Sequence, residues 1–409
     1  MIIYSIIGNG VAGNAAAEII RKHDPDGEIH LFSKERYPFY YLPALPDFIA
    51  GKKQLSQIVI HDLGWYKNHR ITLHLETEIV RVDPERKALV SRKGQHYRYD
   101  KLLLAAGGNA FLPPIKGLET ESPFSLQTMG IFTLRTLDDA EAIKKKAAQG
   151  GTAAVIGGGL LGLEAGNGLR QAGLEVKVVE VFPRLLPRQL DVTGAGILQR
   201  QLETMGFTFY LGATTEEILH NSKKCLIFLK NGEKLMADLV LISAGTRPEL
   251  TLAKALELDQ DKGVKVDDSM RTSKPDIYAA GDLVEHRGRF YGIWPASLEQ
   301  GRVAGAAMAG REAKYDGTVP ANTLKVLGID LMSAGEIDVE NNFISLVSLD
   351  EKHKIYRKLV AKDYILIGAI LLGDIQGADE IQEAIRLKQT LGALKPMAVP
   401  DFDLSCLPQ

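Results

Sequence analysis

Two short glycine patterns with the same spacing constrain this chain more than any other feature of its sequence. They are Gly8-x-Gly10-x-x-Gly13 and Gly157-x-Gly159-x-x-Gly162. Each follows an apolar run and precedes a stretch of small and apolar residues, so each predicts a strand, a tight turn and a helix. One such pattern also occurs in ordinary strand-helix turns, but two in the same context indicate a repeated α/β unit.

The residues that open the two predicted helices indicate what these turns bind. Val11 and Ala12 follow the first turn, and Leu160 follows the second. Glycine without a Cβ lets backbone N–H groups approach a pyrophosphate, and a helix N-terminus adds about half a positive charge there. The sequence therefore predicts that one chain holds two dinucleotides.

An acidic residue about 20 positions after such a pattern accepts hydrogen bonds from the adenosine ribose. After the second pattern this residue is Glu180, which favours NADH over NADPH because a carboxylate repels a 2′-phosphate, and Arg184 is the nearest cation that could weaken that preference. After the first pattern the candidate is Glu35, beside Lys34. A solvated loop charge is the alternative for Glu35.

Further segments, in the same order along the chain, resemble the large family of two-dinucleotide flavoprotein disulfide reductases, the pyridine nucleotide-disulfide oxidoreductases. Residues 272–282 end in Ala-Gly-Asp282, and residues 102–117 contain Ala106 and Gly107, with Ala106 where the family usually has Thr. The resemblance covers residues 1–320. It implies FAD in the first site, with Asp282 hydrogen-bonded to the ribityl chain.

Two more segments carry the same resemblance. Residues 133–143 resemble the family's entry into the NAD domain, and the resemblance implies that Arg135 reaches the flavin cofactor. Residues 241–249 resemble the return crossover, with Gly245 where the nicotinamide arm would pass.

The implied fold class is α/β, with two Rossmann-like dinucleotide-binding domains and a small α+β C-terminal domain. The expected boundaries are 1–115 and 245–320 for FAD, 116–244 for NAD and 321–409 for the last domain. Alternating runs in the last domain predict an antiparallel meander followed by a helix. This part resembles the C-terminal domain of NADH:rubredoxin reductases.

The sequence holds only two cysteines, Cys225 and Cys406, far apart along the chain. Disulfide reductases of the family carry a cysteine pair, and other branches keep one cysteine near the position of Leu42. The chain therefore lacks the cysteine pair that would carry electrons from flavin to a disulfide. The resemblance then implies that the flavin transfers electrons directly to its acceptor. We expect Cys225 to be a core residue. Nine scattered histidines without ligand-like spacing predict no metal site.

Residues 32–51 resemble NADH:rubredoxin reductases and the FAD domain of nitrite reductases, with Pro43 in common. Leu42 and Asp47 stand where relatives carry cations. Lys34, Lys52 or Lys53 could substitute, although an exposed loop is the favoured explanation for these three lysines.

Three residues are expected where the flavin and nicotinamide rings would meet. Pro295 is predicted to be the first residue of a helix whose free N–H groups face the flavin. The resemblance puts Trp294 beside the ring, with an ordinary core tryptophan as the alternative. Glu164 matches the family glutamate near the nicotinamide and flavin, with a simple helix charge as the alternative.

Composition limits the remaining function classes. The net charge of −2 gives no sign of a nucleic-acid partner. The longest apolar run, residues 364–372, is too short to span a bilayer, and the first residues already predict a core strand rather than a cleavable signal. We therefore expect a cytoplasmic protein.

The sequence as a whole predicts an NADH-dependent FAD oxidoreductase that passes electrons to a small redox protein, rubredoxin or ferredoxin, or to a partner subunit. Three alternatives stay open. They are a redox-gated nucleotide-binding interaction protein, the flavin subunit of a nitrite-reductase-like system, and a peroxide-forming NADH oxidase. The acceptor and the oligomeric state are open as well.

Overall fold

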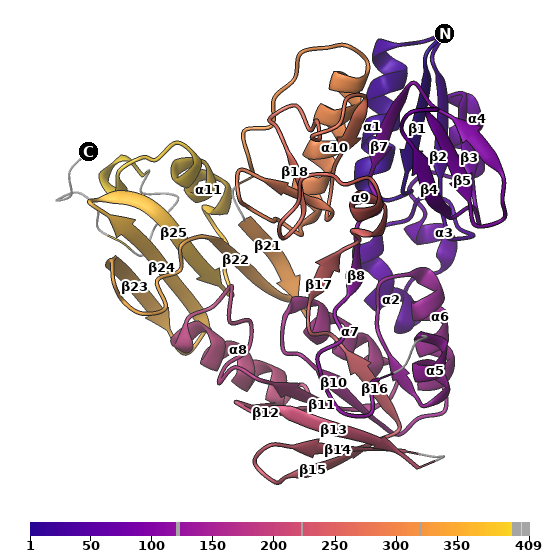
Figure 1. The fold of residues 1–409 in the computed structure, drawn as a ribbon. Helices are drawn as coiled ribbons and strands as arrows, with labels where there is room; N and C mark the ends of the chain where they lie inside the picture. The colour runs from indigo at the N-terminus through magenta and orange to yellow at the C-terminus, as the bar shows by residue number, and fades with distance from the viewer. Residues whose placement is uncertain (120–122, 222–223, 319–320, 395–401, 403–409) are drawn as a thin grey trace.

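A computed structural model describes residues 1–119, 123–221, 224–318, 321–394 and 402. Two parallel sheets, each with five strands, form the cores of two α/β units. An antiparallel sheet, built from the C-terminal part of the chain, lies beside them (Figure 1). This arrangement confirms the predicted α/β class with an α+β C-terminal part.

The first parallel sheet has the strand order β19-β7-β1-β2-β3. It joins the N-terminal residues to a strand from much later in the chain, because β19 pairs with β7. Its elements are β1 (Ile3–Ile7), α1 (Val11–His23), β2 (Glu28–Phe32), β3 (Ile71–His74), β7 (Lys101–Leu104), β19 (Ile277–Ala279) and α10 (Trp294–Met308).

Smaller elements surround this first unit. They are the short helices α2 (Leu45–Ile49), α3 (Leu55–Ile58), α4 (Leu63–Asn68) and α9 (Thr251–Ala255), the 3-10 turn Leu42–Ala44, the antiparallel sheet of β4 (Ile79–Asp83), β5 (Ala88–Ser91) and β6 (His96–Arg98), and the pair β18 (Val264–Val266) and β20 (Val284–His286).

Helix α10 packs against α1 through glycine. A Cβ on Gly301 would lie 2.3 Å from the carbonyl oxygen of Ala12, and one on Gly305 would lie 2.5 Å from that of Ala16. No side chain fits between the two backbones. The start of α10 is thereby brought next to the first glycine pattern.

The second parallel sheet has the order β12-β11-β10-β16-β9. Its elements and neighbours are α5 (Pro123–Thr128), β9 (Ile131–Phe132), α6 (Leu137–Ala147), β10 (Thr152–Ile156), α7 (Leu160–Gln171), β11 (Glu175–Glu180), α8 (Val192–Thr204), β12 (Phe207–Leu211), β16 (Leu239–Ile242) and the hairpin sheet β13 (Thr215–His220), β14 (Cys225–Leu229) and β15 (Lys234–Ala237).

Two features connect the units. The crossover strands β8 (Gly108–Ala110) and β17 (Thr246–Pro248) pair with each other in an antiparallel manner. Helix α7 also lies directly on α2, because a Cβ on Gly168 would come within 2.6 Å of the carbonyl oxygen of Pro46. The two nucleotide units therefore meet backbone to backbone.

The third sheet has the order β21-β22-β25-β24-β23, and every pairing in it is antiparallel. Its elements are β21 (Ala321–Val326), β22 (Ile329–Gly335), β23 (Ile344–Asp350), β24 (Ile355–Lys362), β25 (Ile365–Leu372), α11 (Ala378–Arg386) and a 3-10 turn at Leu391–Ala393. The predicted meander of β23, β24 and β25 is confirmed. The domain boundaries 1–115, 116–244, 245–320 and 321–409 stay proposals.

One sequence-based boundary differs from the structure. Helix α10 begins at Trp294, so Pro295 is its second residue rather than its first. Within the described residues, no helix is long and apolar enough to cross a membrane.

Candidate functional site

One large cavity, of about 1110 Å³, lies where the two nucleotide units meet. Its wall includes the first glycine turn, the loop after β2, the crossover segments, the start of α10 and the first turns of α7. This volume slightly exceeds the range of about 300–1,000 Å³ that is usual for small-molecule sites. The predicted residues that line it are Gly8, Gly10, Val11, Ala12, Lys34, Glu35, Pro43, Ala106, Gly107, Arg135, Leu160, Glu164, Asp282, Trp294 and Pro295.

The first glycine turn has the geometry that a pyrophosphate site needs. Gly8 has a φ of +122°, and a Cβ on it would lie 2.1 Å from the carbonyl oxygen of Ala105. A Cβ on Gly13 would lie 2.0 Å from the carbonyl oxygen of Gly8, whereas no atom lies within 4 Å of the Cβ position of Gly10. Helix α1 also has no side-chain cap and no acidic residue in its first turn. Its N-terminus is therefore suited to a phosphate group.

The second glycine turn repeats this geometry. Gly157 has a φ of +123°, and its Cβ position lies 2.2 Å from the carbonyl oxygen of Ser243. The Cβ position of Gly162 is 2.1 Å from the Gly157 carbonyl, and that of Gly159 has no atom within 4 Å. Helix α7 likewise has no side-chain cap. The structure does not bring Gly13, Gly157, Gly159, Gly162, Glu180 or Gly245 to the wall of the large cavity.

Glu180 is fixed at the end of β11 by backbone groups. Its side chain is buried, with the residue 6% exposed. Oε2 accepts a hydrogen bond from Gly158 N–H at 2.6 Å, and Oε1 accepts one from Phe182 N–H at 2.8 Å. The nearby Arg184 donates to the carbonyl oxygens of Leu190 and Pro187. Sequence reasoning identified Glu180 and Arg184 but not these partners.

Glu35 has a tyrosine partner that sequence reasoning missed. The hydroxyl of Tyr40 donates to Glu35 Oε2 at 2.8 Å and accepts a hydrogen bond from Leu137 N–H at 3.0 Å. Burial raises the pKa of Glu35, while the hydrogen bond from Tyr40 opposes that shift. Lys34 is exposed at the cavity wall. The only sequence signal for Tyr40 was its place in an aromatic loop.

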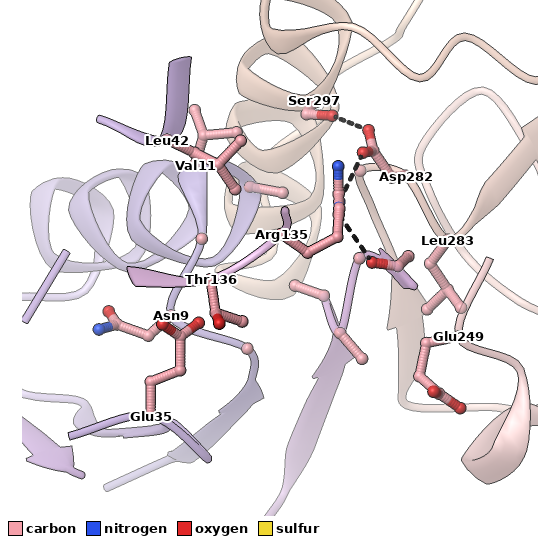
Figure 2. A pocket seen from close by; sticks show the side chains of 18 of the residues that line it. Asn9, Val11, Glu35, Leu42, Arg135, Thr136, Glu249, Asp282, Leu283 and Ser297 are labelled. Atoms are coloured by element: carbon pink, nitrogen blue, oxygen red, sulfur yellow. Dashed lines mark hydrogen bonds and ion pairs between the residues drawn. The ribbon is translucent and has the colours of Figure 1, made fainter. Parts of the chain in front are cut away.

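Arg135 and Asp282 meet in the cavity wall. Arg135 Nη2 lies 3.4 Å from Asp282 Oδ2, and Arg135 Nε donates to the carbonyl oxygen of Gly108 at 3.2 Å. Ser297 Oγ donates to Asp282 Oδ1 at 3.1 Å (Figure 2). Figure 2 shows these three side chains together, with Glu35 apart from them at the other side of the view. Ser297 was missed from the sequence, although it is a small polar residue one turn into α10.

Glu164 faces a turn of the C-terminal domain. Its Oε1 accepts a hydrogen bond from Leu327 N–H at 3.2 Å. Burial raises the pKa of Glu164, and the negative charge of Asp47 adds to the shift, whereas the Leu327 hydrogen bond and the positive charge of Lys52 oppose it. Lys53 pairs with Asp47 at 3.3 Å. Of the three candidate lysines, Lys34 alone lines the cavity.

Three aromatic side chains contact one another at the start of α10. The ring of Trp294 stacks on Phe39 with centroids 5.8 Å apart and meets Tyr41 edge-on at 5.0 Å. Helix α10 has no side-chain cap and no acid in its first turn. Its N-terminus beside Pro295 is therefore suited to negative charge in the cavity.

Cys225 is a buried core residue, as predicted. Its thiol donates to the carbonyl oxygen of Met129 at 3.3 Å, and burial raises its pKa to about 11. Cys406 lies outside the described residues. Within the described part of the chain, no group of three His, Cys, Asp or Glu residues could hold a metal.

Two parallel α/β units, each with an open glycine turn at a helix start and one cavity at their junction, define a two-dinucleotide protein. The profile named pyridine nucleotide-disulphide oxidoreductase matches residues 4–313, and the profile named rubredoxin NAD+ reductase C-terminal domain matches residues 320–389. The chain belongs to the pyridine nucleotide-disulphide oxidoreductase family.

The relatives agree with this assignment. The NADH-rubredoxin oxidoreductase of Clostridium acetobutylicum is 31% identical over 93% of this chain and 93% of its own length. A crystal structure of the NADH:rubredoxin oxidoreductase from that organism has a TM-score of 0.79, with 28% identity over 95% of this chain and 96% of that chain. The nitrite reductase [NAD(P)H] of Bacillus subtilis is 34% identical over 98% of this chain but only 51% of its own length. The chain thus spans about half the length of the first curated relatives it matches.

Proposed function

We propose that this chain is an NADH-dependent FAD oxidoreductase that delivers electrons to a small redox protein such as rubredoxin or ferredoxin. The observation that carries the proposal is the composition of one cavity wall. Asp282 from the first unit lines it together with Arg135, Leu160 and Glu164 from the second. One cavity can therefore bring the reactive ends of two nucleotides together.

The residues of the cavity divide into binding and positioning roles. Bound FAD would supply the chemistry that takes up hydride and releases single electrons. The first glycine turn is suited to its phosphates, Glu35 to its ribose, and Asp282 with Arg135 and Ser297 to its ribityl chain. Pro43, Ala106 and Gly107 complete the wall on the proposed FAD side.

Glu164 and Trp294 are the proposed catalytic residues, at the junction of the rings. The partly buried carboxyl of Glu164 can hold a proton or orient a carboxamide there, and the N-terminus of α10 can stabilise negative charge. Trp294 offers an aromatic edge beside the cavity. Positioning of two rings in contact is the main contribution that a protein makes to such a transfer.

NADH is the proposed donor because of Glu180. The second turn, with Gly157, Gly159, Gly162 and Gly245 around it, is proposed to bind this nucleotide. A buried carboxylate at the ribose position disfavours a 2′-phosphate. Arg184, the nearest candidate to offset this, already donates to two backbone carbonyls.

A second function is favoured by the names of the relatives. The chain is 34% identical to a nitrite reductase [NAD(P)H] over 98% of its own length, so it can also act as the flavin part of a nitrite-reductase-like system. The match of residues 320–389 to the rubredoxin reductase C-terminal domain favours the small-carrier function instead.

The test is anaerobic stopped-flow reduction of the purified FAD-loaded protein by NADH and by NADPH, followed by mixing with rubredoxin or ferredoxin. We expect NADH to bleach the flavin faster than NADPH, and one of the carriers to restore its colour rapidly. If NADH bleaches the flavin but neither carrier reoxidises it, the proposed reduction of a small redox protein is contradicted. That result would favour a partner subunit as the electron acceptor. No bleaching by either nucleotide would contradict the oxidoreductase itself.

A further inference from the structure

The C-terminal sheet contacts α8 of the second nucleotide unit through a buried polar cluster. The hydroxyl of Tyr356 donates to Asp191 Oδ2 at 2.6 Å, and Lys358 Nζ lies 3.3 Å from the same oxygen. Lys358 also donates to the carbonyl oxygen of Asp338 at 2.9 Å. The side chain of Lys358 is only 2% exposed. A buried ammonium group requires such partners, so the contact is closely specified.

Asp191 is also fixed from the other side. It is the N-cap of α8, and its Oδ1 accepts a hydrogen bond from Gly194 N–H at 2.9 Å. The ring of Tyr356 approaches within 3.3 Å of the Cβ position of Gly194. Figure 1 shows α8 below the lower ends of the strands of the C-terminal sheet. The C-terminal domain therefore holds the start of this helix.

The segment that ends at Asp191 begins at Glu180, the proposed ribose acceptor. We name residues 181–190 the nucleotide loop. Leu186 N–H in this loop donates to the carbonyl oxygen of Gly158, inside the second glycine pattern, at 3.1 Å. Gly158 N–H in turn donates to Glu180. The loop therefore packs directly on the turn that is proposed to bind the pyrophosphate.

The nucleotide loop has an exposed outer edge and a buried inner side. Val181 and Phe182 are exposed, by 57% and 51%, while Leu185, Leu186 and Leu190 are fully buried. A movement of Asp191 would shift these buried leucines against Gly158, because a close-packed interior transmits displacement. The adenosine site and the C-terminal domain are thus mechanically connected.

We propose that Tyr356 and Lys358 are positioning residues for the adenosine end of NADH, acting through Asp191 and the nucleotide loop. This inference rests on the proposed function. It gives the C-terminal domain a part in nucleotide affinity as well as in any contact with an electron acceptor.

The test measures the binding of ADP-ribose to the full-length FAD-loaded protein by calorimetry, because this probe carries the adenosine and pyrophosphate without the nicotinamide. Tyr356→Phe removes only the hydroxyl, and Lys358→Met removes only the ammonium group. Loss of one hydrogen bond corresponds to a Kd for ADP-ribose that is higher by about 3- to 10-fold. The limiting rate of flavin reduction at saturating NADH is expected to change less than about 2-fold, since the rings are untouched.

Tyr364→Phe is the matched control. It also removes one tyrosine hydroxyl, at an exposed turn between β24 and β25 of the same sheet, and is expected to leave the Kd unchanged. Asp191→Asn keeps a good N-cap. If the effect runs through Asp191, Tyr356→Phe adds little in the Asp191→Asn background.

Two outcomes overturn the inference. Either the Kd of Tyr356→Phe and Lys358→Met equals that of the wild type, or the Tyr356→Phe effect is unchanged in the Asp191→Asn background. A wild-type protein that binds neither ADP-ribose nor NADH would overturn the proposed function, and this inference with it.

Discussion

Glu164 Oε1 accepts a hydrogen bond from the backbone N–H of Leu327 at 3.2 Å. The two residues are far apart in sequence, since Glu164 lies in α7 and Leu327 in the turn between β21 and β22. Leu327 has a φ of +54°, a left-handed conformation that is uncommon for leucine. The C-terminal domain thus provides the partner of a partly buried carboxyl at the proposed junction of the flavin and nicotinamide rings.

The stability of the protein should depend on the protonation of Glu164. Burial raises the pKa of this carboxyl, so the folded protein binds the proton more tightly than the unfolded chain does. The stabilisation is present below the unfolded pKa, about 4.3, and is lost as the pH rises through the folded pKa. Glu164→Gln keeps an oxygen for Leu327 and avoids this loss. We expect its Tm to exceed that of the wild type near pH 7, with the difference shrinking toward pH 4.

The control for this experiment is Glu383→Gln. The exposed carboxyl of Glu383 pairs with Arg386, which lowers its pKa, so this variant should be slightly less stable than the wild type at pH 7. Thermal scans from pH 4 to 8 at constant ionic strength distinguish the two trends. A Tm difference for Glu164→Gln that is constant over this range would contradict the prediction.

A methyl group in either glycine turn should weaken the binding of one nucleotide and leave the binding of the other unchanged. Gly10 and Gly159 have extended backbones with open space at the Cβ position, so alanine fits the fold but occupies the proposed phosphate space. Gly10→Ala should weaken FAD binding, and Gly159→Ala should weaken NADH binding, each by at least about tenfold, or 1.4 kcal/mol. Flavin content and NADH titration measure the two effects.

The contrasting variant is Gly8→Ala. Its positive φ and its contact with the Ala105 carbonyl leave no room for a methyl group, so this variant should be destabilised in the absence of any nucleotide. Equal loss of both nucleotides in Gly10→Ala would instead indicate general misfolding.

Arg135→Ala should lower FAD affinity. The substitution leaves the partly buried Asp282 without its cation and removes the donor to the Gly108 carbonyl. Hydrogen bonds to charged groups contribute about 1.5–3 kcal/mol, which corresponds to a Kd for FAD that is higher by roughly 10- to 100-fold. Reconstitution of the apoprotein with FAD gives this constant.

Arg36→Ala is the control for Arg135. Arg36 pairs with Asp138 and Glu141 at an exposed site and does not itself line the cavity, and such exposed pairs contribute little because water screens them. Its FAD affinity should stay near that of the wild type. An equal loss of FAD in both variants would show that Arg135 has no special role.

The thiol of Cys225 should be inert in the folded protein. Burial raises its pKa to about 11, so the reactive thiolate is scarce at neutral pH. In a Cys406→Ser background, a disulfide reagent should label Cys225 only after denaturation, and Cys225→Ala should retain flavin reduction by NADH. Rapid labelling of the native protein would contradict this prediction.

The elements that the sequence predicts well are those with local signals. The two glycine patterns, the strand that ends at Glu180 and the C-terminal meander all depend on residues close together in the chain, and the structure confirms them. Helix starts are less certain from sequence, and α10 begins one residue before the predicted Pro295.

The contacts that were missed join distant parts of the chain. Tyr40 binds Glu35 and Leu137, and Leu327 binds Glu164, yet neither pair has a periodicity or motif that marks it. Such partners are set by how whole units pack, which a local pattern does not encode. The predicted site residues themselves stay predictions until the binding experiments are done.

The close approach of Gly168 to the carbonyl of Pro46 has a consequence for the width of the cavity. At this point main chain faces main chain, so no side chain holds the two units apart. Any residue larger than glycine at position 168 would act as a wedge, and the two halves would have to separate to admit it.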